Sequence, residues 1–107
     1  MSRRVVVRPL AKIDLDEQAL YIAKDSVNAA LRFLDAAEST FDRLRSFPEI
    51  GRRREFRHPD LRDLRSWPIP GFEKHVMFYR VFRDLVDILR VVQTWRDLDR
   101  IFGPEKR

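Results

Sequence analysis

The side chains that could do chemistry in this chain are few and scattered. Cysteine is absent, so neither a thiolate nucleophile nor a disulfide is possible, and a reducing compartment suits the chain. The two histidines, His58 and His75, are not spaced as metal ligands. The serines lie in no nucleophile elbow, and the three glycines do not make a phosphate-binding loop. We therefore expect neither a metal nor a cofactor.

One metal-free reaction remains open, the cleavage of RNA by positively charged side chains. Arginines can stabilise the charge that develops on a phosphorane, and Tyr79 lies in the arginine-rich half of the chain. His75 is the only candidate base near that region. These residues alone leave catalysis and binding both open.

The charge of the chain indicates a polyanionic partner, either a nucleic acid or an acidic protein. The 107 residues carry a net charge of +5 and have an isoelectric point near 10.2. Residues 48–107 hold fourteen Lys and Arg against ten Asp and Glu, so most of the excess belongs to the second half. Guanidinium groups bind phosphate and carboxylate through two parallel hydrogen bonds. We expect target or polyanion contacts at Arg52, Arg53, Arg54, Arg57, Arg65 and Arg96.

The apolar periodicity predicts the elements that must position these residues. A short strand at residues 5–7 precedes a helix of about fourteen residues that begins near Leu10. A second helix, residues 27–47, carries a clear apolar stripe and is followed by Pro48 and Gly51. Three strand-like runs follow at residues 61–67, 74–82 and 85–93.

This order, βααβββ, predicts an α+β fold. It consists of an N-terminal strand, a helical hairpin and then a three-stranded, mainly antiparallel sheet, with the hairpin packed on one face. The length suits a single domain that spans residues 1–107. No apolar run approaches the roughly 18 residues of a membrane span, so we expect a cytoplasmic, non-membrane protein.

The last two strands place apolar side chains on both faces of the sheet. Alternation assigns one face of the strand at 74–82 to His75, Met77, Tyr79 and Val81, and the other to Val76, Phe78, Arg80 and Phe82. In the next strand it separates Ile88, Arg90 and Val92 from Asp87, Leu89, Val91 and Gln93.

The helical hairpin can cover only one of these faces, and the face away from it is called the second face below. Either the C-terminal tail, the loop at residues 52–60 or a partner chain must then cover the second face. We favour a partner chain. Because an unpaired guanidinium on such a face would be costly, we expect Arg80 and Arg90 each to meet a carboxylate or carbonyl oxygen.

Several different short motifs are spread along nearly the whole chain. They are Ala11 with Asp14-Leu15, Tyr21-Ile22-Ala23, Phe47-Pro48-Glu49-Ile50-Gly51, Leu64-Arg65, Phe78-Tyr79-Arg80, Ile88-Leu89-Arg90-Val91 and Arg96-Asp97. In this order and spacing they resemble the ParE/RelE superfamily of type II toxin–antitoxin toxins, and the ParE branch more closely.

The resemblance implies a toxin that is neutralised by a cognate ParD-like antitoxin, whose acidic C-terminal segment wraps across it in a hetero-oligomeric complex. Toxins of the ParE branch inhibit DNA gyrase by binding and stabilise its cleaved complex with DNA, so no catalytic residues are implied. DNA is reached only through the antitoxin. The antitoxin is then the partner expected on the second face, with contacts at Val76, Phe78, Arg80, Phe82 and Arg90.

The alternative within the superfamily is the RelE branch, whose toxins cleave mRNA on the ribosome without a metal. That branch uses basic residues on the open sheet face and a tyrosine near the C-terminus. At those positions this chain has Val76, Trp67, Ile69 and Phe102, and only Arg96 matches. A third possibility is a family member that binds its antitoxin and has lost toxicity. In each case we expect the antitoxin gene to be the neighbouring reading frame.

Overall fold

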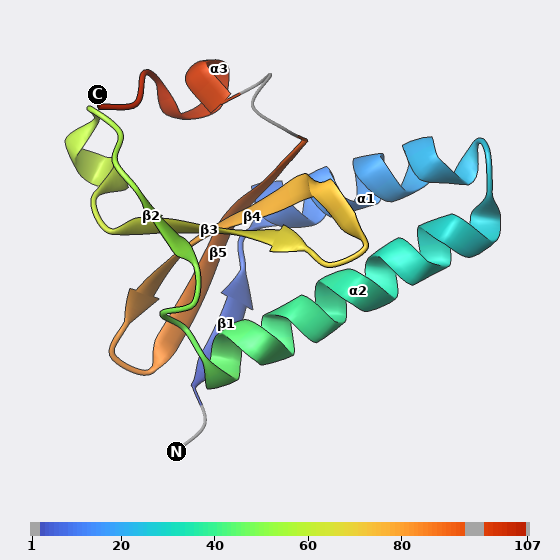
Figure 1. Ribbon diagram of the computed structural model, residues 1–107, viewed down its shortest axis with the longest axis horizontal. Helices are drawn as coiled ribbons and strands as arrows, with labels where there is room; N and C mark the ends of the chain where they lie inside the picture. Colours follow the sequence, from blue (N-terminus) through green and yellow to red (C-terminus); the bar gives the residue numbers. More distant parts are fainter. Residues whose placement is uncertain (1–2, 94–97, 107) are drawn as a thin grey trace.

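The computed structural model describes residues 3–93 and 98–106, and it has the α+β architecture that the sequence predicts (Figure 1). Two helices follow the first strand, and four further strands and a short helix follow the two long helices. The elements are β1 (Arg4–Val7), α1 (Pro9–Ala23), α2 (Val27–Ser46), β2 (Arg52–Arg54), a 3-10 turn (Pro59–Leu61), β3 (Leu64–Ile69), β4 (Phe72–Phe82), β5 (Leu85–Gln93) and α3 (Leu98–Phe102).

The strands form one sheet of five, in the order β1-β5-β4-β3-β2. The sequence predicts three of these strands in the sheet, and two more join at its edges. Strand β1 adds beside β5 in parallel, because the hairpin of α1 and α2 carries the chain back across the sheet. Strand β2 pairs with β3, although its three consecutive arginines suggest a loop. At an edge, such side chains can reach solvent.

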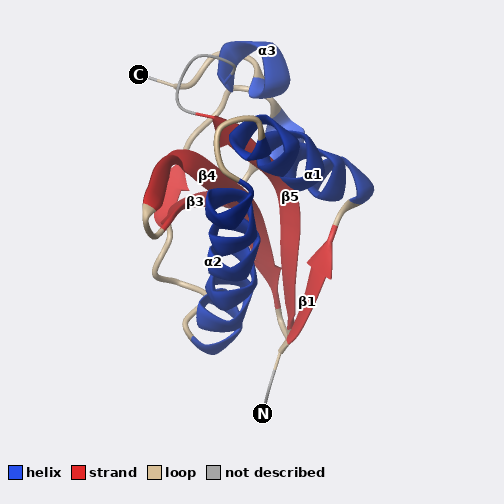
Figure 2. Ribbon diagram, turned by 90° about the vertical axis from the view of Figure 1, so that its right-hand side faces the viewer, coloured by secondary structure: helices blue, strands red, loops and turns tan. Residues whose placement is uncertain are grey.

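Local chemistry explains where the two long helices begin and end. Pro9 stands in the first turn of α1, where its missing N–H costs nothing. The side chain of Ser26 caps α2 by accepting the backbone N–H of Ala29 at 3.1 Å. The helix ends at Ser46, just before Phe47 and Pro48. The two helices lie against the same face of the sheet, as Figure 2 shows.

The core between helices and sheet is built from side chains of both layers. Phe33, Ala37 and Leu44 of α2 meet Met77 and Tyr79 of β4, and all five are at most 1% exposed. Among the described residues no helix is both long and apolar enough to cross a bilayer. Helix α1 also carries apolar residues on its outer side, and at least half of the surface of Leu10, Ile13, Leu20 and Tyr21 is exposed.

A β-bulge corrects the predicted alternation in β5. Phe78 pairs with Arg90 and Tyr79 pairs with Ile88, so Leu89 is an extra residue opposite β4. The expectation that Ile88 and Val92 share a face is therefore wrong. Ile88 packs with the helices, whereas Val92 packs in a second cluster on the opposite face.

The second face is partly covered by the chain itself. Phe78 is 1% exposed, and its ring lies 4.8 Å from that of Phe102 and 6.5 Å from that of Phe56. The C-terminal tail runs beside the loop, since Lys106 donates its N–H to the carbonyl of Glu55. The sequence placed Phe78 at a partner interface, and the structure corrects this: α3, the tail and the loop at 52–60 cover it.

Candidate functional site

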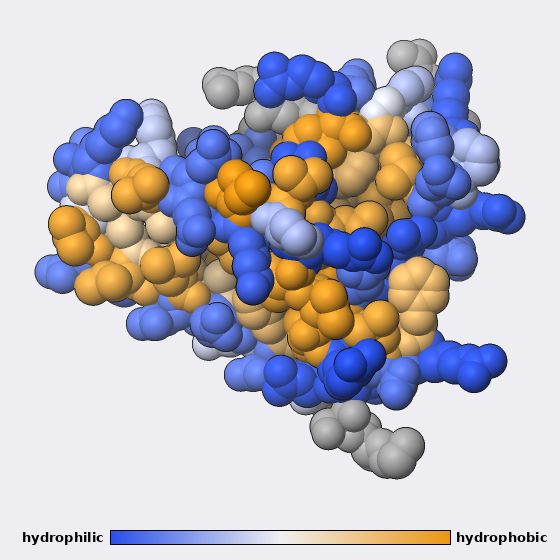
Figure 3. All heavy atoms as spheres, turned by 180° about the vertical axis from the view of Figure 1, so that it is seen from behind, coloured by the Kyte–Doolittle hydropathy of each residue, from blue (hydrophilic) through white to orange (hydrophobic). Residues whose placement is uncertain are grey.

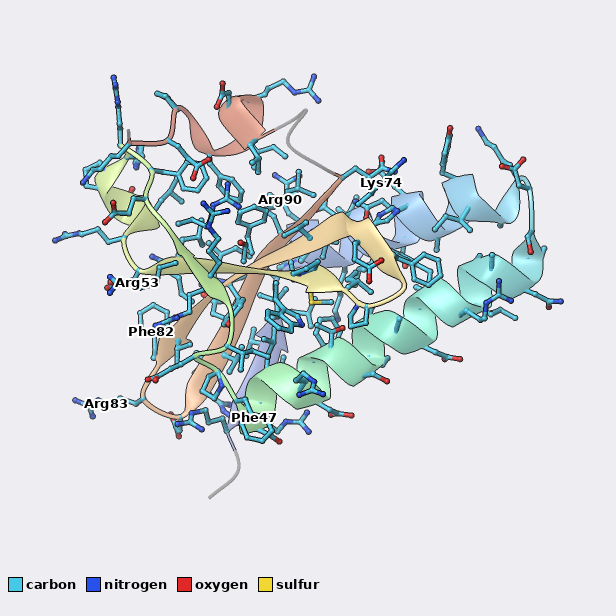
Figure 4. All side chains as sticks on the ribbon, viewed as in Figure 1. Phe47, Arg53, Lys74, Phe82, Arg83 and Arg90 are labelled. Atoms are coloured by element: carbon cyan, nitrogen blue, oxygen red, sulfur yellow. The ribbon has the colours of Figure 1, made fainter. Side chains whose placement is uncertain are left out.

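The part of the second face that α3 leaves uncovered is the candidate binding surface. It is called the open half below, and it lies toward the turn between β4 and β5. Alternation along the strands brings Val6, Phe82 and Leu89 together there, with Arg8, Arg80 and Asp87 among them. Phe82 is 47% exposed and Val6 is 37% exposed. In Figure 4, Phe82 and Arg83 point away from the helices.

Arg80 is held in place by its own chain. Its guanidinium lies over the ring of Phe82, 5.3 Å from the centroid, and one terminal nitrogen donates to the carbonyl of Asp60 at 2.8 Å. The sequence predicts a carboxylate or a carbonyl partner for Arg80, and the carbonyl partner is confirmed. The Nε of Arg80 is buried and has no hydrogen-bond partner among the described residues.

Arg90 also finds its partner within the chain. It donates to both carboxylate oxygens of Asp14 in α1, at 2.8 and 3.0 Å, and Asp14 additionally accepts the N–H of Val91. The hydrogen bond that Arg90 donates to the Asp14 carboxylate raises the pKa of Arg90. The expected carboxylate is present and comes from α1, so Arg90 joins the helix to the sheet, and its contact with an antitoxin stays a prediction.

A third charged pair, between Arg8 and Asp87, was not predicted. Arg8 donates to both oxygens of Asp87, at 2.7 and 2.8 Å. Asp87 is 1% exposed, whereas the Arg8 side chain is about half exposed. The hydrogen bond to Asp87 raises the pKa of Arg8. An acidic residue inside an apolar strand was the available signal, because a buried carboxylate needs a cation.

The arginine cluster at residues 52–57 separates into two kinds of residue. The guanidinium of Arg54 lies over the rings of Phe56 and Phe78 and donates to both oxygens of Glu105, at 2.8 and 3.0 Å. This hydrogen bond lowers the pKa of Glu105. Arg54 therefore fastens the C-terminal tail over the second face. Arg52 and Arg57 are exposed and remain available to a partner.

The other three arginines proposed as polyanion contacts have different surroundings. Arg53 is exposed and meets the equally exposed Asp63 at 3.2 Å, a pairing that contributes little. Arg65 donates to the carbonyls of Glu49 and Gly51, so it supports the loop after α2. Arg96 lies outside the described residues.

Tyr79 and His75, the two residues with acid–base chemistry, face the helices and not the second face. The Tyr79 hydroxyl donates to the carbonyl of Pro48 at 2.7 Å and accepts the N–H of Gly51 at 2.8 Å. Burial raises the pKa of Tyr79. His75 lies against the ring of Phe33, with Nδ1 2.8 Å from the side-chain oxygen of Gln18, and burial lowers its pKa.

Val76 stands where the mRNA-cleaving branch has a cation, and the side chains around it are apolar as well. Val76 packs in the cluster of the second face, beside a pocket of about 500 Å³ next to α3. The pocket lining combines three apolar side chains with three cationic ones and one carboxylate. Its lining residues are Arg52, Arg54, Glu73, Lys74, Val76, Phe78 and Leu98. Such a lining suits an amphipathic acidic segment.

The fold just described is of the α+β class, with a helical hairpin on one face of a five-stranded sheet and arginines around the second face. A family model described as the ParE toxin of the type II toxin–antitoxin system parDE matches residues 5–98. The chain belongs to this family. The ParE branch that the sequence motifs indicate is thereby confirmed.

A solved structure has a similar fold. It comes from a chromosomal ParDE TA system from P. aeruginosa, and it superposes with a TM-score of 0.68 at 18% sequence identity. The alignment covers 86% of this chain and 96% of that chain. This likeness shows the fold. A search of the curated proteins found no matching sequence.

Proposed function

We propose that this protein acts in the cytoplasm as a toxin that inhibits DNA gyrase by binding it, and that a cognate ParD-like antitoxin holds it inactive. The observation that carries the proposal is the ParE toxin family match over residues 5–98. The ParE branch of the superfamily is the one whose members act on gyrase.

The placement of the reactive side chains supports binding over catalysis. A general base must reach the proton that it removes. His75 is buried on the helix face, and the hydroxyl of Tyr79 is occupied by Pro48 and Gly51. Val76 and Ile69 stand where the mRNA-cleaving branch has cations, and Ile69 is fully buried.

We assign the two expected partners to different places: the gyrase target to the exposed arginines and the antitoxin to the second face. Arg52, Arg53 and Arg57 form the candidate contact with the target, because their guanidinium groups reach solvent. Arg80 and Phe82 remain candidate contacts of the antitoxin, and Val76 becomes one through the pocket beside α3. An acidic antitoxin segment complements the cations around both places.

A supercoiling assay tests the proposal. The purified toxin should abolish supercoiling by gyrase and leave cleaved DNA when the reaction is stopped with detergent and protease. Addition of the co-purified antitoxin should restore supercoiling. The double variant Arg52→Glu/Arg57→Glu should lose inhibition, while Arg32→Glu, an exposed change on α2, should retain it.

Two outcomes would overturn the proposed target. If gyrase is unaffected and mRNA is cut at codon-linked positions in cells expressing the toxin, the protein is a ribosome-dependent ribonuclease. If expression leaves growth unharmed while the toxin still binds its antitoxin, the protein is an antitoxin-binding member without toxicity.

A further inference from the structure

One end of the molecule gathers arginines that the proposed function does not use. Three segments meet there: the start of β1, the end of α2 and the turn between β4 and β5, as Figures 1 and 2 show. The N–H of Arg4 donates to the carbonyl of Asp84 at 2.8 Å, which joins the strand to the turn. Figure 3 shows strongly hydrophilic side chains along the lower edge of the molecule, where β1 begins. This region is called the basic end below, and its charged residues are Arg3, Arg4, Asp42, Arg43, Arg45, Arg83 and Asp84.

The arginines of the basic end outnumber its acids by five to two. Among the described residues one ion pair forms between them, from Arg45 to Asp42 at 2.9 Å. Within residues 3–93 and 98–106, no side-chain hydrogen bond or ion pair reaches Arg4, Arg43 or Arg83, and all three are exposed. Unpaired guanidinium groups that share one surface attract an anion that carries several charges.

Arg83 occupies a position that disfavours an arginine. Its φ is 36°, in the left-handed region that glycine and asparagine enter most easily. A two-residue turn between antiparallel strands usually has one of those residues at such a position. Basic residues suit the end of a helix, which accounts for Arg43 and Arg45 but not for Arg83. No hydrogen bond or ion pair of the Arg83 side chain offsets the backbone strain, so the reason for an arginine here lies outside the folded chain.

Phe47 adds an aromatic ring to the same surface. It follows α2 directly, and 57% of its surface is exposed. In Figure 4, Phe47 and Arg83 are seen at the same end of the molecule. A protein–protein interface has an apolar core with charges at its rim, whereas surfaces that bind nucleic acid are polar and strongly positive. An exposed ring among unpaired arginines fits the second kind, because proteins in the minor groove combine arginines with an apolar wedge such as Phe.

From these features we propose that the basic end binds the backbone of duplex DNA. Arg4, Arg43 and Arg83 donate to phosphate oxygens, and the ring of Phe47 packs in the groove. This inference rests on the proposed function in one respect: the nucleic acid is DNA because the proposed target, gyrase, holds a DNA duplex. The toxin then touches both components of the cleaved complex. The resemblance implied instead that DNA is reached only through the antitoxin.

Fluorescence anisotropy with the purified toxin and a labelled duplex of about 30 base pairs tests the contact without gyrase. The double variant Arg43→Gln/Arg83→Gln removes two charges from the basic end. Its matched control, Lys24→Gln/Arg32→Gln, removes two exposed charges near the connection of α1 and α2. We expect the basic-end variant to bind DNA about tenfold more weakly than the control. The slope of log affinity against log salt should also fall by about 1.8, because each phosphate contact adds about 0.9.

Single substitutions at Arg83 separate a binding role from a structural one. Arg83→Gly relieves the left-handed strain, so it should raise the melting temperature of the toxin and yet weaken DNA binding as much as Arg83→Gln does. Arg83→Lys keeps the charge and should retain most of the affinity. A merely structural arginine would not combine a gain in stability with a loss of binding. If Arg83→Gly and Arg83→Lys bind DNA equally well, this side chain does not contact DNA and the proposal is wrong.

The outcomes separate this inference from the proposed function. If the wild-type toxin inhibits gyrase and the double variant binds DNA as well as its control, the DNA contact is overturned and the function stands. If the double variant loses inhibition with unchanged DNA binding, the basic end contacts the gyrase protein, which also overturns the DNA contact. Tighter binding of a single-stranded RNA of the same length overturns DNA as the ligand. Weakened DNA binding by the double variant of a toxin without effect on gyrase supports the basic end and overturns the target.

Discussion

The hydroxyl of Tyr79 provides the most direct test of how the loop after α2 is held. It lies in the core and joins two backbone groups of that loop, the carbonyl of Pro48 and the N–H of Gly51. In Tyr79→Phe the ring stays in place, and both backbone groups are left buried without a partner. Each such group costs about 1–3 kcal/mol, so the variant should lose about 2–6 kcal/mol of stability.

Urea unfolding measures this loss as a lower midpoint with an unchanged slope. The melting temperature should fall by roughly 10–25 °C for a chain of this size. Tyr21→Phe is the matched control, because Tyr21 is 63% exposed and should change the free energy of unfolding by less than about 0.5 kcal/mol. A Tyr79→Phe variant as stable as the control would refute the reasoning.

Gly51 supplies a second arm of the same experiment. A Cβ at this position would collide with the hydroxyl and ring of Tyr79, so Gly51→Ala should destabilise the protein strongly. Tyr79→Phe removes the nearest of the colliding atoms. The double variant should therefore be more stable than the sum of the two single losses predicts, since contacting residues are not additive.

Three further predictions concern pH, the tail and a helix cap. Burial lowers the pKa of folded His75 below its unfolded value of about 6.5, so the unfolded chain binds more protons as the pH falls. The free energy of unfolding should therefore decrease below about pH 6.5, and His75→Gln should show a weaker pH dependence in urea titrations at pH 7.5 and 5.5. Arg54→Gln should release the C-terminal tail and increase the binding of a hydrophobic dye, whereas the control Arg53→Gln should not. If the two variants bind the same amount of dye, the pair of Arg54 and Glu105 does not fasten the tail. Ser26→Ala should lower the free energy of unfolding by about 1 kcal/mol through the lost cap of α2, and an unchanged midpoint in urea would contradict that role.

Periodicity predicted the elements of this fold well because each leaves a local trace. The apolar stripe of α2 and the β-rich runs of β4 and β5 depend on residues near each other in sequence. The bulge at Leu89 has no such trace, since no glycine or proline marks it, and it moved half of β5 to the other face. Strand β2 was missed because its three arginines look like a loop.

The site was harder to predict because its pairs join distant parts of the chain. Asp14 and Asp87 are visible in the sequence as acids within apolar patterns, but nothing local tells which arginine each will meet. The prediction that Arg80 and Arg90 need oxygen partners is confirmed, and it required only that an unpaired charge is costly to bury. The identity of those partners follows only from the packing of α1 and the loop at 52–60 against the sheet.

The pairing of β1 with β5 constrains when the sheet can form during synthesis of the chain. Residues 4–7 bond with residues 85–88, and the tail that covers the second face includes Glu105. A chain growing from the ribosome therefore holds its first strand without a partner until residues 85–88 have been made. Bringing such distant segments together is slow compared with local helix formation. The sheet can be completed only after residue 88 has been made, and its cover only after residue 105, so the nascent chain is without either binding face until then.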